Sequence, residues 1–379
     1  MHFPSRAAFT RRSFLRRTAL GAGALYCGRG LAAETPAQVP PAVLAPLAPT
    51  VRTKIASFNH YEDAVLVAGE PPAISPGSFT IVALPDTQRY AEVNPQGFLA
   101  QTEWIAANAV TRNIACALHL GDITDNNEPA QWELAVRAMK QLDGQVPYFM
   151  AMGNHDYSAG GVCSDRTTLF NDYFPLANYG GLPTFGGVYD KEPERLENSF
   201  HVLSAGGRDL LVLCLEFGPR RDVVRWANEI VARHPRHAAI LVTHAYVYFD
   251  DRRFDWAAYR GEQSWNPHSY KVANSTGDDI SDGEELWQTL VSKHPNFIMT
   301  VNGHVLEDGL GRLTSAAGTR EVHQMLFNCQ MRPNGGDGWM RLLEFKQGGI
   351  VEVWDFSPLR QERNESAQNK FTLRLAPVA

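Results

Sequence analysis

The chain has 379 residues, of which 44% are hydrophobic and 20% are charged, and its formal net charge is −6. This composition is ordinary for a globular protein and excludes a wholly disordered or collagen-like chain. The length allows one large domain or two smaller ones.

The first 33 residues have the pattern of an export signal. Arg11 and Arg12 precede a short run rich in Ala, Gly and Leu, which ends near Ala33. A charged segment, an apolar segment and a small-residue end are typical of a signal peptide, and the paired arginines resemble a bacterial twin-arginine signal. We therefore expect a periplasmic or secreted protein that uses the twin-arginine export machinery. A basic arm that stays on the mature chain is the alternative.

Loss of this leader would make the chain strongly acidic. Residues 1–33 carry six arginines and no acidic residue, so the net charge of −6 becomes −12 for the remainder. Such a surface is poorly suited to nucleic acid or to anionic lipid. We therefore expect no nucleic-acid partner.

Five cysteines are present, and Cys27 lies in the expected leader. Cys116 and Cys214 fall within apolar, strand-like runs, where buried free thiols are expected. Cys163 and Cys329 fall in loop-like or strand-end positions. An oxidising compartment would allow a disulfide between them, but the sequence does not decide whether it forms.

Strands and helices alternate along most of the chain. Residues 34–78 begin with a Pro- and Ala-rich leader, and one or two accessory strands are expected before residue 79. The apolar periodicity then predicts strands at 79–84, 114–120, 147–152, 210–215, 238–243 and 297–301, and helices at 95–110, from 129, 222–233 and 284–293. This alternation predicts an α/β domain whose strands are buried on both faces.

The pattern changes after residue 309. Residues 322–328, 339–345 and 350–356 form a strand meander without helices, so the domain has a mixed sheet or two sheets. We expect this domain to cover 79–356 and to be followed by a C-terminal extension at 357–379. Two long irregular stretches, 157–198 and 246–282, interrupt the units and are expected to lie over a functional site.

Five of the predicted strands end in a side chain that can bind a metal ion. These side chains are Asp86, Asp122, Asn154, His244 and His304. Open α/β sheets bind ligands at the carboxyl ends of their strands, and carboxylate, amide and imidazole groups together suit Mn, Fe or Zn. One such motif alone is commonly a turn, but five in this order indicate a shared metal site.

These motifs resemble the signature blocks of the calcineurin-like metallophosphoesterases. The matching blocks are Asp86-x-Gln88, Gly121-Asp122-x-x-Asp125, Gly153-Asn154-His155-Asp156, Thr243-His244 and Gly303-His304. The resemblance covers about residues 79–355. It implies a four-layer sandwich of two mixed β-sheets flanked by helices, with two metal ions at its centre.

The resemblance also implies which residues hold each ion. Asp122 would bridge the two ions, and Asp86 and Gln88 would bind the first. The second ion would be completed by Asn154, His244 and His304.

Two departures weaken the first metal position. The family more often has histidine where this chain has Gln88, and a second histidine where this chain has Leu306. Asp308 and His323 are the candidates to fill the gap. One or two divalent or trivalent ions are therefore expected.

The resemblance implies a hydrolase that cleaves a phosphate mono- or diester in a small phosphorylated substrate. A metal-bound hydroxide would attack phosphorus, and His155 would protonate the leaving oxygen while Asp156 orients it. Arg89 and Arg332 are candidates to hold a phosphate through paired hydrogen bonds, although each could equally be a surface arginine.

Two other functions stay open at this point. A ligand-binding protein without catalysis would explain the depleted first metal position, but such a protein has little use for His155. A nuclease fits the motifs, but the acidic mature chain argues against it.

Overall fold

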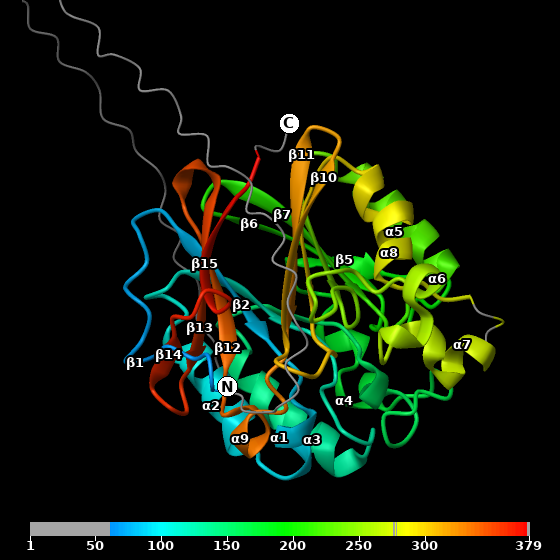
Figure 1. The fold of residues 1–379 in the computed structure, drawn as a ribbon, viewed down its shortest axis with the longest axis horizontal. Helices are drawn as coiled ribbons and strands as arrows, with labels where there is room; N and C mark the ends of the chain where they lie inside the picture. The colour runs from blue at the N-terminus through cyan, green and yellow to red at the C-terminus, as the bar shows by residue number, and fades with distance from the viewer. Residues whose placement is uncertain (1–60, 276, 278, 377–379) are drawn as a thin grey trace, which may run out of the picture. The chain divides into compact units, whose positions relative to one another are not determined.

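The computed structural model describes residues 61–275, 277 and 279–376. The expected export signal, the Pro-rich linker and Cys27 lie outside these residues. The described residues form two mixed β-sheets with helices beside them (Figure 1). This confirms the predicted fold class.

The first sheet contains eight strands in the order β1-β14-β13-β12-β2-β3-β4, with β15 paired to β13. β2, β3 and β4 are parallel, whereas the other pairs are antiparallel. The strands are β1 (Leu66–Ala68), β2 (Phe79–Leu84), β3 (Ile114–His119), β4 (Tyr148–Met150), β12 (Met340–Phe345), β13 (Ile350–Ser357), β14 (Glu362–Asn364) and β15 (Lys370–Arg374).

The second sheet contains seven strands in the order β10-β11-β9-β8-β7-β6-β5. Its central strands β11, β9, β8 and β7 are parallel, and both edges are antiparallel. The strands are β5 (Phe185–Val188), β6 (Ser199–Ala205), β7 (Arg208–Leu215), β8 (Ala238–Thr243), β9 (Phe297–Asn302), β10 (Leu310–Ala317) and β11 (Arg320–Phe327).

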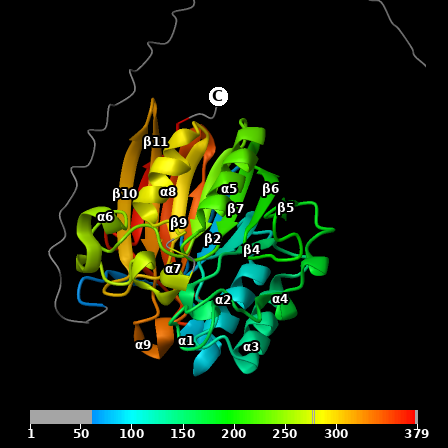
Figure 2. The ribbon, with the colours of Figure 1, turned by 90° about the vertical axis from the view of Figure 1, so that its right-hand side faces the viewer.

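The helices fall into two groups, with α1, α2 and α3 together and α5 and α8 near the strands of the second sheet (Figure 2). None of the helices in the described part of the chain is long and apolar enough to cross a bilayer. The helices are α1 (Gln88–Glu92), α2 (Gln96–Ala107), α3 (Pro129–Met139), α4 (Phe170–Tyr173), α5 (Arg221–Arg233), α6 (Trp256–Tyr259), α7 (Lys271–Ser275), α8 (Gly283–Thr289) and α9 (Pro333–Gly336).

Alternate residues of the central strands face two different cores. Ile81 of β2 belongs to a buried cluster with Val212 of β7 and Ile240 of β8, which places this core between the sheets. Its neighbour Val82 belongs to the other cluster, together with Phe98 of α2. Because strand side chains alternate between faces, a run that is apolar at every position becomes buried on both sides.

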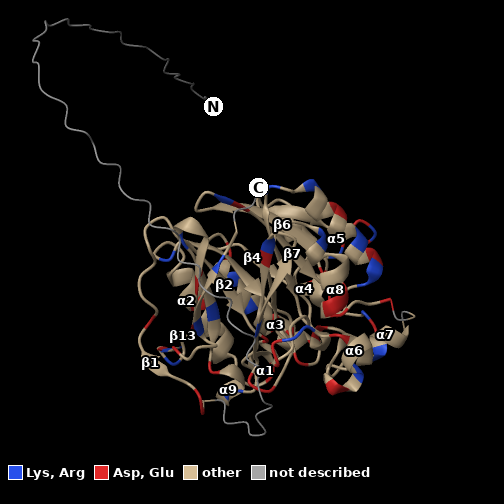
Figure 3. Ribbon diagram, turned by 45° about the horizontal axis from the view of Figure 1, so that its top comes forward, with Lys and Arg blue, Asp and Glu red and all other residues tan. Residues whose placement is uncertain are grey.

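Charges of both signs alternate along the exposed side of α5 (Figure 3). Arg225 pairs with Asp222 at 2.8 Å and with Glu229 at 2.7 Å, which are i, i+3 and i, i+4 spacings. Exposed pairs of this kind contribute little to stability, because water screens them. The helix is therefore held mainly by its buried side, which includes Val223 and Ile230.

The C-terminal residues do not form an extension outside the domain, which differs from the expectation from the sequence. β14 and β15 both pair with β13, and β14 also pairs with β1. The first sheet therefore continues past residue 356, and the accessory strand expected before residue 79 is its edge.

Candidate metal centre

The polar residues predicted at the strand ends meet at one edge, where both sheets contribute. Asp122 follows β3, His244 follows β8 and His304 follows β9. One ligand atom from each of these three side chains lies within 4.8 Å of the others, and all three residues are buried. Such a group of carboxylate and imidazole donors can hold a divalent ion.

Glycine precedes these residues because their backbones pack too closely for a side chain. A Cβ on Gly153 would lie 2.1 Å from Asp122 Oδ1, and a Cβ on Gly303 would lie 2.0 Å from Asp86 Oδ1. Gly121 has a φ of +96° and packs against the His244 ring. The Gly-Asp, Gly-Asn and Gly-His motifs thus bring carboxylate, amide and imidazole groups together.

Backbone carbonyls fix the orientation of three of these side chains. Nδ1 of His244 lies 2.7 Å from the Leu120 oxygen, and Nε2 of His304 lies 2.8 Å from the Trp265 oxygen. Nδ2 of Asn154 donates to the Gly161 oxygen at 2.9 Å. Carbonyl contacts of this kind set the imidazole tautomer and turn the other donor atom of each side chain toward the centre.

Two buried atoms of these side chains make no hydrogen bond, Asn154 Oδ1 and His244 Nε2. The neighbour of His244 Nε2 is the Asp122 carboxylate, whose Oδ1 lies 3.1 Å away. Buried polar atoms are nearly always paired, because an unpaired one costs about 1–3 kcal/mol. The unpaired amide oxygen, and an imidazole nitrogen that faces only a carboxylate, therefore fit a metal ion beside Asp122 and His304.

The charges of the buried groups also favour a cation here. Burial raises the pKa of Asp86 to about 7. Burial opposes protonation of His244, but Asp122 and Asp86 outweigh it and raise the pKa of His244 to about 9. A metal ion would supply the positive charge that the two carboxylates otherwise draw from His244.

His155 lies at the edge of this group and is partly exposed. Its backbone N–H donates to Asp122 Oδ1 at 2.9 Å, and its ring Nδ1 lies 2.7 Å from the Asp125 carbonyl oxygen. Asp125 Oδ1 is 3.6 Å from the same nitrogen. A Cβ on Gly161 would lie 2.3 Å from the imidazole, so the following loop packs on the ring.

Asp156 does not orient the imidazole, which corrects the expectation from the sequence. Its carboxylate accepts hydrogen bonds from the backbone N–H groups of Gly153, Thr124 and Ile123, at 2.9, 2.8 and 3.2 Å. These bonds tie the loop after β3 to the loop after β4. Because those N–H groups already occupy the carboxylate, Asp125 takes the position beside the ring.

A comparison with protein families agrees with this geometry. The family model for calcineurin-like phosphoesterases matches residues 79–308. The chain belongs to the calcineurin-like phosphoesterase family. The predicted resemblance is thereby confirmed, whereas the twin-arginine signal stays a prediction.

Similarity to individual proteins covers most of this chain. The uncharacterized protein YvnB of Bacillus subtilis (strain 168) is 31% identical over 314 residues, which are 79% of this chain and 21% of that protein. The chain thus spans about a fifth of its relative.

Several solved structures also match, with low sequence identity. Purple acid phosphatase PPD1 of yellow lupin is 13% identical with a TM-score of 0.44, over 80% of this chain and 55% of that one. GAP50 of Plasmodium is 11% identical with a TM-score of 0.44, over 79% and 89%. The 5'-nucleotidase precursor of Thermus thermophilus is 13% identical with a TM-score of 0.40, over 79% and 55%.

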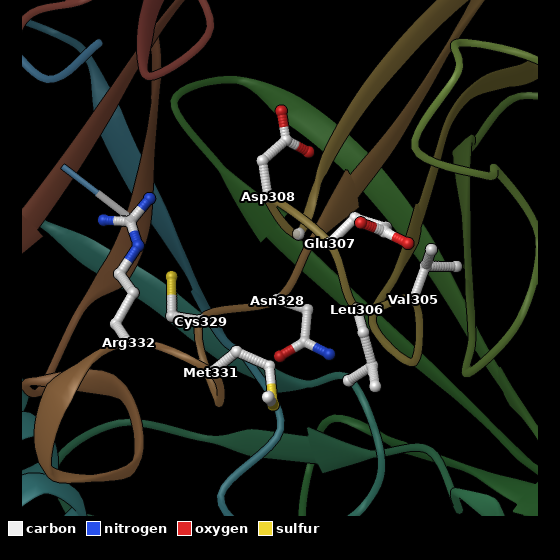
Figure 4. Close-up of a pocket in the computed structure, with 9 residues that line it drawn as sticks. Val305, Leu306, Glu307, Asp308, Asn328, Cys329, Met331 and Arg332 are labelled. Atoms are coloured by element: carbon white, nitrogen blue, oxygen red, sulfur yellow. The ribbon is translucent and has the colours of Figure 1, made fainter. Parts of the chain in front are cut away.

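Neither candidate for the histidine missing from the calcineurin-like pattern lies in a position to replace it. Both ring nitrogens of His323 are engaged, with Thr314 Oγ1 at 2.9 Å and the Arg374 oxygen at 3.0 Å. Asp308 accepts a hydrogen bond from the Leu310 N–H and points away from Asn328 (Figure 4). Leu306 itself offers only hydrocarbon.

The two arginines proposed as phosphate ligands lie in different surroundings. The Arg89 side chain is 47% exposed and lies 2.7 Å from Glu92 and 3.9 Å from Asp125. It is therefore at the edge of the site, near His155. Arg332 is buried, and its guanidinium lies over the rings of Tyr61 and Trp339, at 5.5 and 5.2 Å from their centres. Figure 4 shows it pointing away from Leu306.

The two long irregular stretches meet beside the candidate ligand His304. The Val272 N–H donates to the Cys163 oxygen at 2.9 Å, which joins one stretch to the other. Tyr270 packs 5.9 Å from the His304 ring and 4.9 Å from Phe217. No sequence motif marks these contacts, because the first uses backbone atoms and the others join rings that are far apart in the chain.

The cysteines of the described residues are all free. Cys116 and Cys214 are buried thiols, as expected. Cys163 and Cys329 are also free, so the disulfide considered between them does not form here. Cys163 lies in the first long irregular stretch, whereas Cys329 follows β11.

A second group of possible ligands serves a structural purpose. Asp282 and Glu285 form the capping box at the start of α8, and His268 Nε2 lies 2.8 Å from Glu285 Oε2. The carboxylates of this group accept hydrogen bonds from backbone N–H groups, including that of Trp256. These contacts stabilise the helix start.

Proposed function

We propose that the chain is an exported, metal-dependent phosphoesterase that hydrolyses a phosphate mono- or diester in a small molecule. The observation that carries this proposal is the buried group of Asp122, His244 and His304, beside which Asn154 Oδ1 has no hydrogen-bond partner and His244 Nε2 faces Asp122 Oδ1 at 3.1 Å. A bound Mn, Fe or Zn ion would polarise the phosphoryl oxygens and lower the pKa of a bound water.

His155 supplies the proton that the leaving group needs. Its Nδ1 faces the Asp125 carbonyl, so its Nε2 is the nitrogen left to donate to the ester oxygen as the P–O bond breaks. The charges of Asp122 and Asp125 outweigh the effect of burial and raise the pKa of His155, which favours the protonated form. Arg89 is exposed at the same edge and can hold a phosphate oxygen.

Activity with simple esters tests the proposal. After chelation, p-nitrophenyl phosphate and bis-p-nitrophenyl phosphate are assayed with Mn²⁺, Fe²⁺ or Zn²⁺ added back. We expect turnover that depends on the added ion, and the faster ester assigns the class. If neither ester is hydrolysed with any ion, the phosphoesterase proposal fails.

The His155→Ala variant tests the acid. Loss of a general acid costs about 10²–10⁴ in turnover, and the metal content should stay unchanged because His155 is not among the proposed ligands. His294→Ala is the matched control. His294 precedes β9, whereas His304 follows it, and the His294 ring contacts Asn228 of α5. Full activity in His155→Ala would contradict the assigned role.

A ligand-binding protein on the same scaffold is the second candidate function. The observation that favours it is the loss of two family histidines, at Gln88 and Leu306. Such a protein would bind inorganic phosphate or a phosphate ester in a metal-dependent way but would release no product. The ester assay separates the two functions directly.

Export is tested at the paired arginines. Replacing Arg11 and Arg12 by lysine keeps the charge of the leader but removes the arginine pair. We expect the precursor to accumulate in the cytoplasm of the expressing bacterium. Unchanged periplasmic yield of the variant would contradict the twin-arginine route.

A further inference from the structure

The carboxylate of Asp86, expected at the first metal position, is surrounded by hydrogen-bond donors. Its Oδ2 accepts from the His304 N–H and from Asn328 Nδ2, both at 3.0 Å, and its Oδ1 lies 3.2 Å from the same His304 nitrogen. Asp86 is 1% exposed. These N–H groups occupy the carboxylate oxygens that an ion at the first position would have to use.

Asn328 cannot offer its oxygen to a metal ion in this arrangement. Its Oδ1 accepts a hydrogen bond from the Gln330 N–H at 2.9 Å, which fixes the amide so that its NH₂ group faces Asp86. An NH₂ group has no lone pair for a cation. Asn328 follows β11 and lies beside Leu306 in Figure 4. A donor therefore contacts Asp86 where the family pattern would add a ligand.

Gln88 likewise presents a donor to the carboxylate expected to bridge two ions. Its Nε2 lies 2.9 Å from Asp122 Oδ2. The other oxygen, Asp122 Oδ1, accepts from the His155 N–H and lies 3.1 Å from His244 Nε2. The remaining oxygen, Gln88 Oε1, is buried without a partner. A single neutral amide oxygen is a poor substitute for the two imidazoles of the family pattern.

The second metal position offers more preformed acceptors than the first. The first offers the single amide oxygen of Gln88, whereas at the second His244 and Asn154 have donors already satisfied by backbone carbonyls, and each leaves an atom without a hydrogen bond. His304 is held in the same way by Trp265. Preformed acceptors favour ion binding because no protein hydrogen bond has to break.

We propose that this chain carries a mononuclear centre, with one ion at Asp122, Asn154, His244 and His304. At the first position, the amide groups of Asn328 and Gln88 and the His304 N–H replace the second ion of the family pattern. The inference depends on the proposed function only for the metal site itself. The inference reduces the number of metal ions expected per chain from one or two to one.

Metal stoichiometry tests this directly. Chelated protein is titrated with Mn²⁺ and with Zn²⁺, and the ions retained per chain are counted by native mass spectrometry and elemental analysis. We expect one equivalent, with electron paramagnetic resonance of the Mn²⁺ form showing isolated ions without exchange coupling. His244→Ala should retain none.

Restoring the family histidines should create the second position. The double variant Gln88→His, Leu306→His is expected to bind two equivalents and to give an exchange-coupled Mn²⁺ spectrum. The matched control is Gln88→Ala, Leu306→Ala, which should stay at one equivalent. If the double variant does not fold, the count for the unaltered chain still decides the question.

The outcomes separate this inference from the proposed function. An active protein that binds two ions with affinities within about tenfold overturns the mononuclear centre and leaves the phosphoesterase proposal intact. An inactive protein that binds one ion overturns the phosphoesterase proposal and leaves the mononuclear centre intact. A protein that binds no ion overturns both.

Discussion

The Asp156 carboxylate is the acceptor for three buried backbone N–H groups, although it touches no proposed ligand side chain. Replacing it by alanine would leave three buried N–H groups, those of Gly153, Thr124 and Ile123, without an acceptor. Each unpaired group costs about 1–3 kcal/mol. We predict that Asp156→Ala lowers the free energy of unfolding by roughly 3 kcal/mol or more and weakens metal binding, as measured by urea denaturation and metal titration.

Asp125→Asn is the comparison for that variant. The Asp125 side chain is 12% exposed, and its carboxylate lies 3.6 Å from the imidazole of His155, whose main contact is with the backbone carbonyl. We expect a change below about 1 kcal/mol in unfolding free energy, unchanged metal affinity and reduced turnover. Equal stability losses in the two variants would contradict the separate roles.

The candidate ligand residues can be predicted from the sequence, but the hydrogen-bond partners of the site residues cannot. Asp86, Asp122, His244 and His304 stand out because each follows an apolar strand, and the structure brings them together. The role expected for Asp156 rests on its position next to His155 in the chain. Neighbours in sequence point in different directions in a tight turn, so adjacency does not predict contact. Asn328 is missed because no motif marks it.

At the scale of elements, the segment from Trp265 to Tyr270 acts as a support for His304. Trp265 adopts a φ of +64°, a conformation that costs about 1 kcal/mol or more for a residue with a side chain. Its carbonyl accepts the hydrogen bond of His304. Asn266 is buried and holds this turn, because its Oδ1 accepts from the His268 N–H and its Nδ2 donates to Asp282.

We therefore predict that Asn266→Ala weakens metal binding without abolishing the fold. Removal of a group that orients a ligand typically costs 10–100-fold in metal affinity. Competition with a chromogenic chelator measures that affinity. The control is Asp255→Ala, which removes the side-chain cap of α6 in the same stretch of chain. If both variants keep the original affinity, this segment does not support His304.

Glu216, at the end of β7, connects α5 to the first long loop. Its buried carboxylate contacts Arg220 at 2.8 Å and Arg166 at 3.4 Å. Burial raises the pKa of Glu216, but the two arginines outweigh it and hold the pKa below the ordinary value of 4.5. Because the folded pKa is depressed, this group stabilises the fold above pH 4.5, and the contribution is lost as the pH falls through the folded value.

Glu216→Gln should therefore destabilise the protein in a pH-dependent way. At pH 7 we expect a loss of about 3 kcal/mol, since two partly buried arginines lose their charge partner. The difference from the unaltered chain should shrink as the pH falls below 4.5, where Glu216 of the unfolded chain becomes protonated, and should be lost below the lower folded pKa. Thermal denaturation across this pH range measures it. A difference that is constant with pH would contradict the ionic role.

The strands are the most predictable elements, for a physical reason. A strand buried on both faces needs an apolar residue at nearly every position. The strand predicted at 238–243 accordingly coincides with β8 (Ala238–Thr243). The predicted helix at 284–293 is less accurate, because α8 ends at Thr289 and a separate 3-10 turn covers Val291–Lys293. Contacts through carbonyls, such as that of Leu120, carry no side-chain signal and cannot be predicted.

For the molecule as a whole, the boundary of the domain decides how much of the chain the metal centre needs. The motifs end near His304, and the sequence predicts a domain that ends at 356 with a C-terminal extension at 357–379. In the structure, β15 pairs with Ile350–Trp354 and β14 with Asp355–Ser357, so together they cover the full length of β13. Arg341 also donates to the Gln368 oxygen at 3.1 Å.

We predict that a chain ending at Ser357 fails to fold cooperatively. It would leave β13 as a long exposed edge and would detach β1, whose partner is β14; unpaired edges of this kind promote aggregation. Far-UV circular dichroism, soluble yield and the melting temperature measure the effect. A chain ending at residue 376 is the control, since it keeps both strands. If the shorter chain melts as cooperatively as the control and binds the same amount of metal, the C-terminal strands do not belong to the folding unit, and the boundary at 356 expected from the sequence would stand.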